Sequence, residues 1–139
     1  MDNKKGPLNF LVISRLVKFI SIMDIIYFRD YCLSKSGTTE DTPFDKDTLC
    51  FRVGGKIFAI TDMLHFESIN LKCDPDIAIE LREKYSGIQP GFHMNKKHWN
   101  TVSCDGSVSD SLILKLADDS YDLIFYSLPK KVQEDLNNK

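Results

Sequence analysis

The sequence lacks a surplus of basic residues. Its 139 residues include 18 Lys and Arg against 20 Asp and Glu, which gives a formal net charge of −2 at pH 7. Dedicated nucleic-acid-binding domains usually carry a basic surplus, because neutralising phosphates supplies much of their affinity. Whole-chain charge therefore argues against nucleic acid as a partner, except through a local patch.

Cysteine is sparse, and its four positions exclude the usual cysteine motifs. Cys32, Cys50, Cys73 and Cys104 form no C-x-x-C and no zinc-ribbon spacing. Two disulfides would be arithmetically possible in a secreted protein, but each cysteine sits in an apolar run where a small buried hydrophobe fits. We therefore predict reduced, buried thiols and a cytoplasmic protein. Cys73, just before a helix start, is the best-placed nucleophile, yet strand alternation assigns it to the core.

The sequence also lacks an apolar run long enough to span a bilayer. The run within residues 8–22 is interrupted by Arg15 and Lys18, and it has no small-residue cleavage site of a signal peptide. As a helix this segment would be amphipathic, which fits either a membrane-surface or partner-binding helix or a simple extension. We favour the extension. The prediction is one domain over residues 23–136, with residues 1–22 outside it and no integral membrane segment.

Signatures of catalysis and of cofactor binding are missing as well. Gly54-Gly55 is followed by no phosphate-binding pattern, and the chain has no nucleophile elbow or local Ser-His-Asp signature. The carboxylates between Glu40 and Asp47 lack EF-hand spacing, and Asp118-Asp119 fits a solvated helix face better than an acid–base pair. We therefore predict a protein that is not an enzyme and holds no cofactor.

Zinc-competent side chains are present but too far apart to share an ion. His93 and His98 alone cannot complete a site. Strand alternation places Cys104 about 20 Å from His98, at ~3.3 Å per residue. No metal site is predicted.

What the sequence does contain is a regular succession of helix and strand patterns. Helix patterns have apolar stripes with capping residues or proline at their starts, and strand patterns alternate or flank a Gly-Gly turn. Together they predict an α+β, two-layer fold in which an antiparallel sheet is covered by helices. Helices are expected over Met23–Lys35, from Asp74-Pro75 to Gly87, and from a Ser107/Asp110 cap to Pro129, with a last turn or short helix to Leu136. Strands are expected over Leu49–Val53, Lys56–Thr61, Ser68–Cys73, Gln89–Met94 and His98–Cys104. Residues Thr38–Thr48 are expected to form a loop.

The stretch from Pro90 to Gly106 concentrates two of the three histidines, the single tryptophan and a Lys-Lys pair. Within it, residues 90–102 are the most specific of several runs that match one known pattern. The other runs are Met23–Ile25, Phe28–Ser34, Thr48–Ala59, Leu71–Pro75, Asp105-Gly106 and Ser120–Leu123. In these runs the chain resembles the MmcQ/YjbR family of small bacterial proteins. The resemblance implies a two-layer fold in the order α-β-β-β-α-β-β-α, and a DNA-binding "double wing" of strands and loops.

Two functions fit this stretch. The first is a DNA-binding module that uses a strand–turn–strand wing at residues 93–102 and the neighbouring sheet face. Cationic side chains would contact phosphates, amides and imidazoles would form hydrogen bonds, and the tryptophan would stack on a base. The residues assigned to this surface are His93, Asn95, Lys96, Lys97, His98, Trp99, Asn100, Arg52 and Lys72, with Asn70 beside them.

The second function is a non-enzymatic module that binds a protein or a small ligand on the open sheet face or in a groove beside it. A purely structural interpretation also stands, in which Trp99 covers the sheet and the lysines are solvated. Salt separates the two functions, because DNA binding weakens steeply with salt and a ligand groove that depends on Trp99 does not. A monomer is expected in each case.

Overall fold

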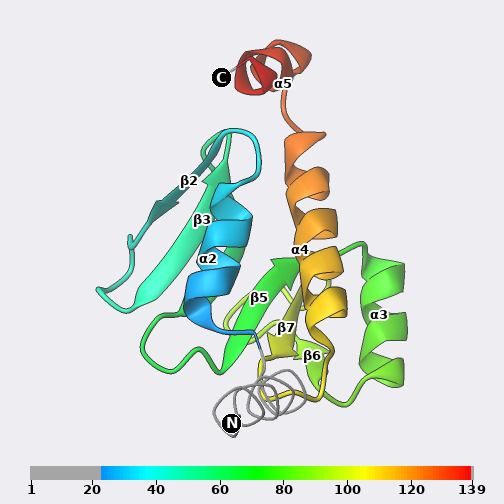
Figure 1. The fold of residues 1–139 in the computed structure, drawn as a ribbon. Helices are drawn as coiled ribbons and strands as arrows, with labels where there is room; N and C mark the ends of the chain where they lie inside the picture. Colours follow the sequence, from blue (N-terminus) through cyan, green and yellow to red (C-terminus); the bar gives the residue numbers. More distant parts are fainter. Residues whose placement is uncertain (1–22, 139) are drawn as a thin grey trace, which may run out of the picture.

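A six-stranded sheet forms the centre of the computed structural model, which describes residues 23–138 (Figure 1). The strands are β2 (Thr38–Asp41), β3 (Thr48–Val53), β4 (Lys56–Asp62), β5 (Ser68–Lys72), β6 (Ile88–Pro90) and β7 (Trp99–Ser103). They lie in the order β2-β3-β4-β5-β7-β6, and every neighbouring pair is antiparallel. The predicted α+β class with an antiparallel sheet is confirmed.

Helices cover one face of this sheet. They are α2 (Ile25–Leu33), α3 (Pro75–Lys84), α4 (Asp110–Phe125) and α5 (Lys130–Asn137). Figure 1 shows α2 and α4 crossing the same face, α3 beside α4, and α5 at one end of the molecule. We call the covered face the inner face and the opposite one the outer face. The added strand β2 departs from the expected element order, whereas α5 is the short helix that was one of the two expectations for the segment up to Leu136.

The core lies between the helices and the inner face of the sheet. In β5, for example, Ile69 and Leu71 are buried, whereas the alternate residues are half-exposed, as the alternation predicted. Four aromatic rings run through the core with neighbouring centroids 5.3–6.4 Å apart, in the order Phe28, Phe51, Phe58 and Tyr121. Burying such a ring stabilises the fold by roughly 1.5–3 kcal/mol, so this row fixes α2 and α4 on the sheet.

Side-chain caps set the helix starts. Asp24 accepts a hydrogen bond from the Tyr27 amide at 2.8 Å, and Asp74 caps α3 with Pro75 in its first turn, as the sequence predicted. The cap predicted for α4 was wrong. Ser109, not Ser107, accepts from the Leu112 amide at 3.2 Å. The Ser107 amide instead donates to Asp105 at 2.9 Å, so the turn before the helix holds that residue.

The first part of the expected loop at residues 38–48 is a strand. β2 pairs with β3 from Thr38 opposite Val53 to Asp41 opposite Cys50. β2 is an edge strand, so its side chains are not alternately buried, and the sequence shows no apolar alternation. Ion pairs fix it instead. Arg29 Nε lies 2.8 Å from Glu40 Oε1, and Arg52 Nε lies 3.0 Å from Asp41 Oδ1.

The extension expected over residues 1–22 lies outside the described residues, and the domain limits of 23 and 136 stay a prediction. In the part of the chain from 23 to 138, no helix combines the length and apolar content that crossing a membrane requires.

Candidate functional site

The Pro90–Gly106 stretch forms a long loop between two strands instead of a tight turn. β6 ends at Pro90 and β7 begins at Trp99, so the expected strands Gln89–Met94 and His98–Cys104 were too long. The loop leaves the ladder where the Gly91 amide donates to the Trp99 carbonyl at 2.8 Å. His93 then adopts a left-handed backbone with φ of 60°, which an extended strand does not permit.

Hydrogen bonds within the loop hold it in one shape. Asn95 Oδ1 accepts from the amides of Lys97 and His98 at 2.9 and 3.2 Å, and the Asn95 carbonyl accepts from the Trp99 amide at 3.0 Å. Lys96 Nζ donates to the Gly91 carbonyl at 2.8 Å. Two side chains assigned to ligand contact therefore already have structural partners inside the loop.

Arg82, on the last turn of α3, anchors the loop to the helix layer. Its Nε donates to Asn100 Oδ1 at 2.7 Å, and its Nη2 donates to the carbonyls of Lys96 and Trp99. Asn100 is only 2% exposed and also donates to the Ala78 carbonyl at 3.5 Å. Asn100 thus faces the helices and is removed from the candidate outer surface.

Sequence reasoning missed Arg82, although one signal was available. Alternation along β7 placed Asn100 on the same side as Val102, which is an inward position. A buried amide requires hydrogen-bond partners, so a polar residue on the covering helix was to be expected. Helix periodicity alone did not specify which residue of α3 would supply it.

Of the remaining assigned residues, Asn70, Lys72 and Trp99 lie on the outer face, and His93 and Lys97 lie in the adjoining loop. His98 is half-buried, its carbonyl accepts from the Cys73 amide at 2.8 Å, and it is not part of this group. Thr101 Oγ1 donates to Asn70 Oδ1 at 2.5 Å and accepts from the Phe92 amide at 2.8 Å, which draws the start of the loop over β5 and β7. Lys72 Nζ lies 5.8 Å from the centroid of the half-buried Trp99 ring. We call the set Asn70, Lys72, Phe92, His93, Lys97, Trp99 and Thr101 the β5–β7 surface.

The β5–β7 surface exposes aromatic rings. The Phe92 side chain is 64% exposed, and its ring centroid lies 4.1 Å from that of His93. The sequence did not predict Phe92 as a site residue, because an apolar residue in a strand pattern is normally buried. Arg52, by contrast, lies on β3 with β4 between it and β5, and it is bound to Asp41 and to the Gly55 carbonyl. It does not join this surface.

The four thiols are buried and unpaired, as predicted. Burial raises the pKa of Cys32 and Cys104 to about 12 and that of Cys73 to about 11, and it also raises the pKa of Cys50. Because the thiolate is the reactive form, these side chains are poor nucleophiles at neutral pH. Within residues 23–138, no three His, Cys, Asp or Glu side chains gather as a metal site requires.

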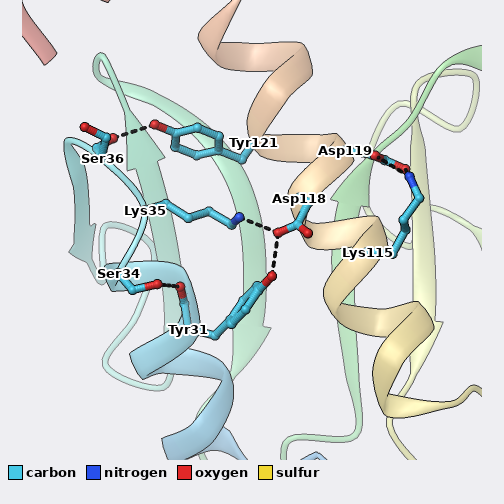
Figure 2. A network of polar contacts seen from close by, with 8 residues as sticks. All are labelled: Tyr31, Ser34, Lys35, Ser36, Lys115, Asp118, Asp119 and Tyr121. Atoms are coloured by element: carbon cyan, nitrogen blue, oxygen red, sulfur yellow. Dashed lines mark hydrogen bonds and ion pairs between the residues drawn. The ribbon is translucent and has the colours of Figure 1, made fainter. Parts of the chain in front are cut away.

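A polar cluster between α2 and α4 was not expected from the sequence (Figure 2). Tyr31 donates its hydroxyl to Asp118 Oδ1 at 2.7 Å, and Lys35 Nζ forms an ion pair with the same oxygen. The Lys35 ammonium also lies 4.9 Å and 5.3 Å from the ring centroids of Tyr31 and Tyr121. Asp118 was assigned to a solvated face, but it ties two helices together, so only Asp119 fits that assignment.

Comparison with known proteins gives consistent matches. A family model described as YjbR matches residues 33–123. The chain is 39% identical over 93 residues to "Uncharacterized protein YbdF" of Escherichia coli O157:H7, covering 66% of this chain and 76% of that one. It is 34% identical over 110 residues to "Uncharacterized protein YjbR" of Escherichia coli strain K12, covering 78% and 93%.

Solved structures agree with these sequence matches. The crystal structure of Deinococcus radiodurans protein DR2400, whose domain is described as DUF419, superposes with a TM-score of 0.77 at 35% identity, covering 82% of this chain and 88% of that one. The crystal structure of a Pseudomonas syringae protein gives a TM-score of 0.62 at 32% identity, covering 73% and 99%. The two-layer arrangement is therefore shared with experimentally determined folds.

Proposed function

This chain belongs to the YjbR family, and we propose that it is a non-enzymatic module that binds single-stranded DNA through its β5–β7 surface. One observation carries the proposal. The rings of Phe92, His93 and Trp99 belong to that surface, the Lys72 ammonium lies 5.8 Å from the Trp99 ring centroid, and the exposed Lys97 lies in the adjoining loop. Stacking of bases on aromatic rings beside cations is the usual chemistry of single-strand binding.

The charge of the surface favours a single strand over a duplex. Lys96 already donates to the Gly91 carbonyl and Arg52 is paired with Asp41, so two lysines remain for phosphates. Tight duplex binding typically uses six or more phosphate contacts. Base stacking contributes about 1–3 kcal/mol per base and does not depend on a basic surplus. It therefore suits a chain whose net charge is −2.

The rigidity of the loop supports the same proposal. Hydrogen bonds from Arg82, Asn95 and Thr101 hold the backbone of the loop, including the Phe92 amide, in one arrangement. A pre-ordered surface loses little conformational entropy on binding. Burial raises the pKa of the thiols and so disfavours the thiolate, which supports binding without thiol catalysis as part of this proposal.

The test is titration with a single-stranded oligonucleotide, followed by the fluorescence of Trp99, the only tryptophan. Stacking should quench that fluorescence. Lys97→Ala should weaken binding and reduce the slope of log K against log salt from about −1.4 to about −0.7, because each phosphate contact contributes about −0.7. Lys46→Ala, an exposed lysine in the loop before β3, is the matched control and should change neither value.

A second titration uses labelled oligonucleotide, so that Trp99 itself can be changed. Trp99→Ala should weaken binding by roughly 5- to 150-fold, the equivalent of 1–3 kcal/mol, whereas Trp99→Phe should keep part of the affinity. Circular dichroism checks that both variants fold. Equal affinity of parent and Trp99→Ala would remove the β5–β7 surface as the DNA site.

The exposed Phe92 ring favours one alternative, a protein or small-ligand partner on the same surface. Such a partner would depend on Phe92 and Trp99 but not on Lys97. A Trp99-dependent affinity that does not change between low and high salt would therefore select the alternative over DNA.

A further inference from the structure

A concave surface lies on the helix side of the molecule, between the start of α3 and the second half of α4. It is a groove of about 600 Å³. Asp119, Asp122 and Leu123 line it from α4 and Tyr126 lines it from the C-cap of that helix, at positions i, i+3, i+4 and i+7, so one stripe of the helix faces the groove. Ile77 lines it from α3.

The groove exposes apolar side chains that a solvated helix face does not require. Tyr126 is 69% exposed, Ile77 49% and Leu123 38%. Ile77 lines the groove from α3, and Leu123 and Tyr126 line it from the end of α4. Clustered exposed apolar residues with a polar rim mark interaction sites more often than scattered ones do.

The rim of the groove is acidic. Three carboxylates, Asp74, Asp119 and Asp122, face one lysine, Lys115, so the formal charge of these four groups is 1 − 3 = −2. Lys115 and Asp119 pair with each other at 2.9 Å, on the side of α4 away from Asp118 (Figure 2). Among the described residues Asp122 makes no side-chain hydrogen bond or ion pair. A nucleic acid is disfavoured here, and a cationic partner is favoured.

We propose that this groove binds an amphipathic helix of a partner protein, with an apolar stripe flanked by Lys or Arg. The stripe of α4 from Lys115 to Tyr126 is about 16 Å long at 1.5 Å per residue, which matches three turns of a partner helix. Helices that dock in such grooves place apolar anchors at i, i+3 or i+4, and i+7. The anchors would contact Ile77, Leu123 and Tyr126, and the flanking cations would approach Asp122 and Asp74.

The probe is a labelled synthetic helical peptide of four turns, with leucines on one face and lysines on both sides of it. Its binding to the full chain is measured by fluorescence anisotropy. Tyr126→Ser should weaken binding at least tenfold, and Asp122→Asn about threefold with a shallower salt dependence. Ile26→Ser on α2 removes an equally exposed apolar residue, 71% exposed, and should leave the affinity unchanged.

Two altered peptides complete the experiment. A peptide with glutamate in place of lysine and one with the same composition but a scrambled stripe should both bind at least tenfold more weakly. If either binds as well as the parent peptide, or if Tyr126→Ser binds it unchanged, the proposal is overturned. The variants leave the β5–β7 surface intact, so this result is separate from that of the DNA test.

Other occupants would show themselves in the same experiment. A concentration-dependent dimer that Tyr126→Ser abolishes would identify a second copy of the chain as the occupant. Tighter peptide binding after Leu16→Asp with Phe19→Asp would identify the chain's own basic segment, residues 1–22, as the competitor. Either outcome would replace the partner helix.

Discussion

Ser120 connects α4 to the sheet at the point where two strands separate. It is fully buried, and its Oγ donates to the Phe58 carbonyl at 2.6 Å and accepts from the Lys72 amide at 2.9 Å. The pairing of β4 with β5 stops at Ala59 and Leu71, so these two backbone groups would otherwise face each other unbonded. One hydroxyl therefore completes the strand pairing.

Ser120→Ala should lower the free energy of unfolding by about 2–3 kcal/mol, because it leaves two buried backbone groups without partners. Ser86→Ala, at an exposed serine before β6, is the control and should change stability by less than about 0.5 kcal/mol. Denaturant unfolding measures both. Equal midpoints for the two variants would mean that the Ser120 bridge contributes nothing.

Tyr31 should make stability depend on pH at the alkaline end. Its hydrogen bond to Asp118, followed by burial, raises its pKa from 10.0 to about 12. Because the folded-state pKa is the higher one, this contribution is complete below pH 10 and is lost as the pH rises towards 12. Tyr121 and the cysteines also have a raised pKa, so the measured quantity is the difference between the parent and Tyr31→Phe.

That difference in unfolding free energy should be constant up to about pH 9 and should shrink as the pH approaches 12. Phenolate absorbance of the folded parent, compared with Tyr31→Phe, should show one tyrosine that ionises late. A difference in unfolding free energy that does not change with pH would show that the hydrogen bond from Tyr31 to Asp118 does not contribute to stability in this way.

For single residues, the sequence predicted burial well and hydrogen-bond partners less well. Alternation and apolar context correctly placed all four cysteines and Ile69 in the interior. They did not predict that Asp118 bonds to α2 or that Asn100 bonds to Arg82. Those pairs depend on how helices cross the sheet, and helix periodicity does not encode the crossing.

Among the elements, the β3–β4 hairpin gives the sharpest prediction. Both turn glycines have left-handed backbones, with φ of 59° at Gly54 and 82° at Gly55. A Cβ at Gly54 would lie 2.5 Å from Leu128 Cδ1, whereas a Cβ at Gly55 would meet nothing within 4 Å. Gly55→Ala should therefore cost about 1–2 kcal/mol from backbone strain alone, and Gly54→Ala about 1–3 kcal/mol more from overpacking.

Denaturant unfolding of both variants tests this order. Gly55→Asn serves as a further control, because asparagine tolerates the left-handed region and should be nearly neutral. If Gly54→Ala and Gly55→Ala lose the same stability, the contact with Leu128 does not constrain the turn.

The same hairpin shows why some elements were predictable. Gly54-Gly55 requires a turn whatever the rest of the chain does, so β3 and β4 were placed nearly correctly. β2 was missed because an edge strand held by ion pairs carries no apolar alternation. The 91–98 loop was drawn too short because the left-handed His93 and the anchor from Arg82 leave no local signal.

For the molecule as a whole, the β5–β7 surface and the helix side differ in charge, although the net charge does not show this difference. Residues 23–139 carry 18 − 4 = 14 basic and 20 − 1 = 19 acidic side chains. Lys72 nevertheless lies beside the Trp99 ring on the β5–β7 surface, with the exposed Lys97 in the adjoining loop, whereas Asp122 and its neighbours gather on the helix side. The layers were predictable from the sequence, but this separation depends on the docking of α3 beside α4.

Two leucines of the C-terminal segment pack against glycines in the turns of the N-terminal half. Leu128 covers Gly54, and Leu136 of α5 covers Gly37, where a Cβ would lie 2.6 Å from Leu136 Cδ2. Ser36 Oγ also donates to the Leu136 carbonyl at 3.0 Å. α5 buries two residues, Gln133 and Leu136, whereas α4 buries seven, so the attachment of α5 should be weaker than that of α4.

Leu136→Ala should therefore release α5 without unfolding the rest. A buried Leu→Ala change costs about 2–5 kcal/mol when the whole fold must absorb it, but a terminal helix can detach first and limit the loss. Native-state hydrogen exchange should show amides of α5 losing most of their protection while those of α4 change only slightly. Lys131→Ala, an exposed change on α5, should leave both sets protected. If α5 and α4 lose protection equally, α5 unfolds together with the rest of the domain. In that case the contact between Leu136 and Gly37 stabilises the whole fold.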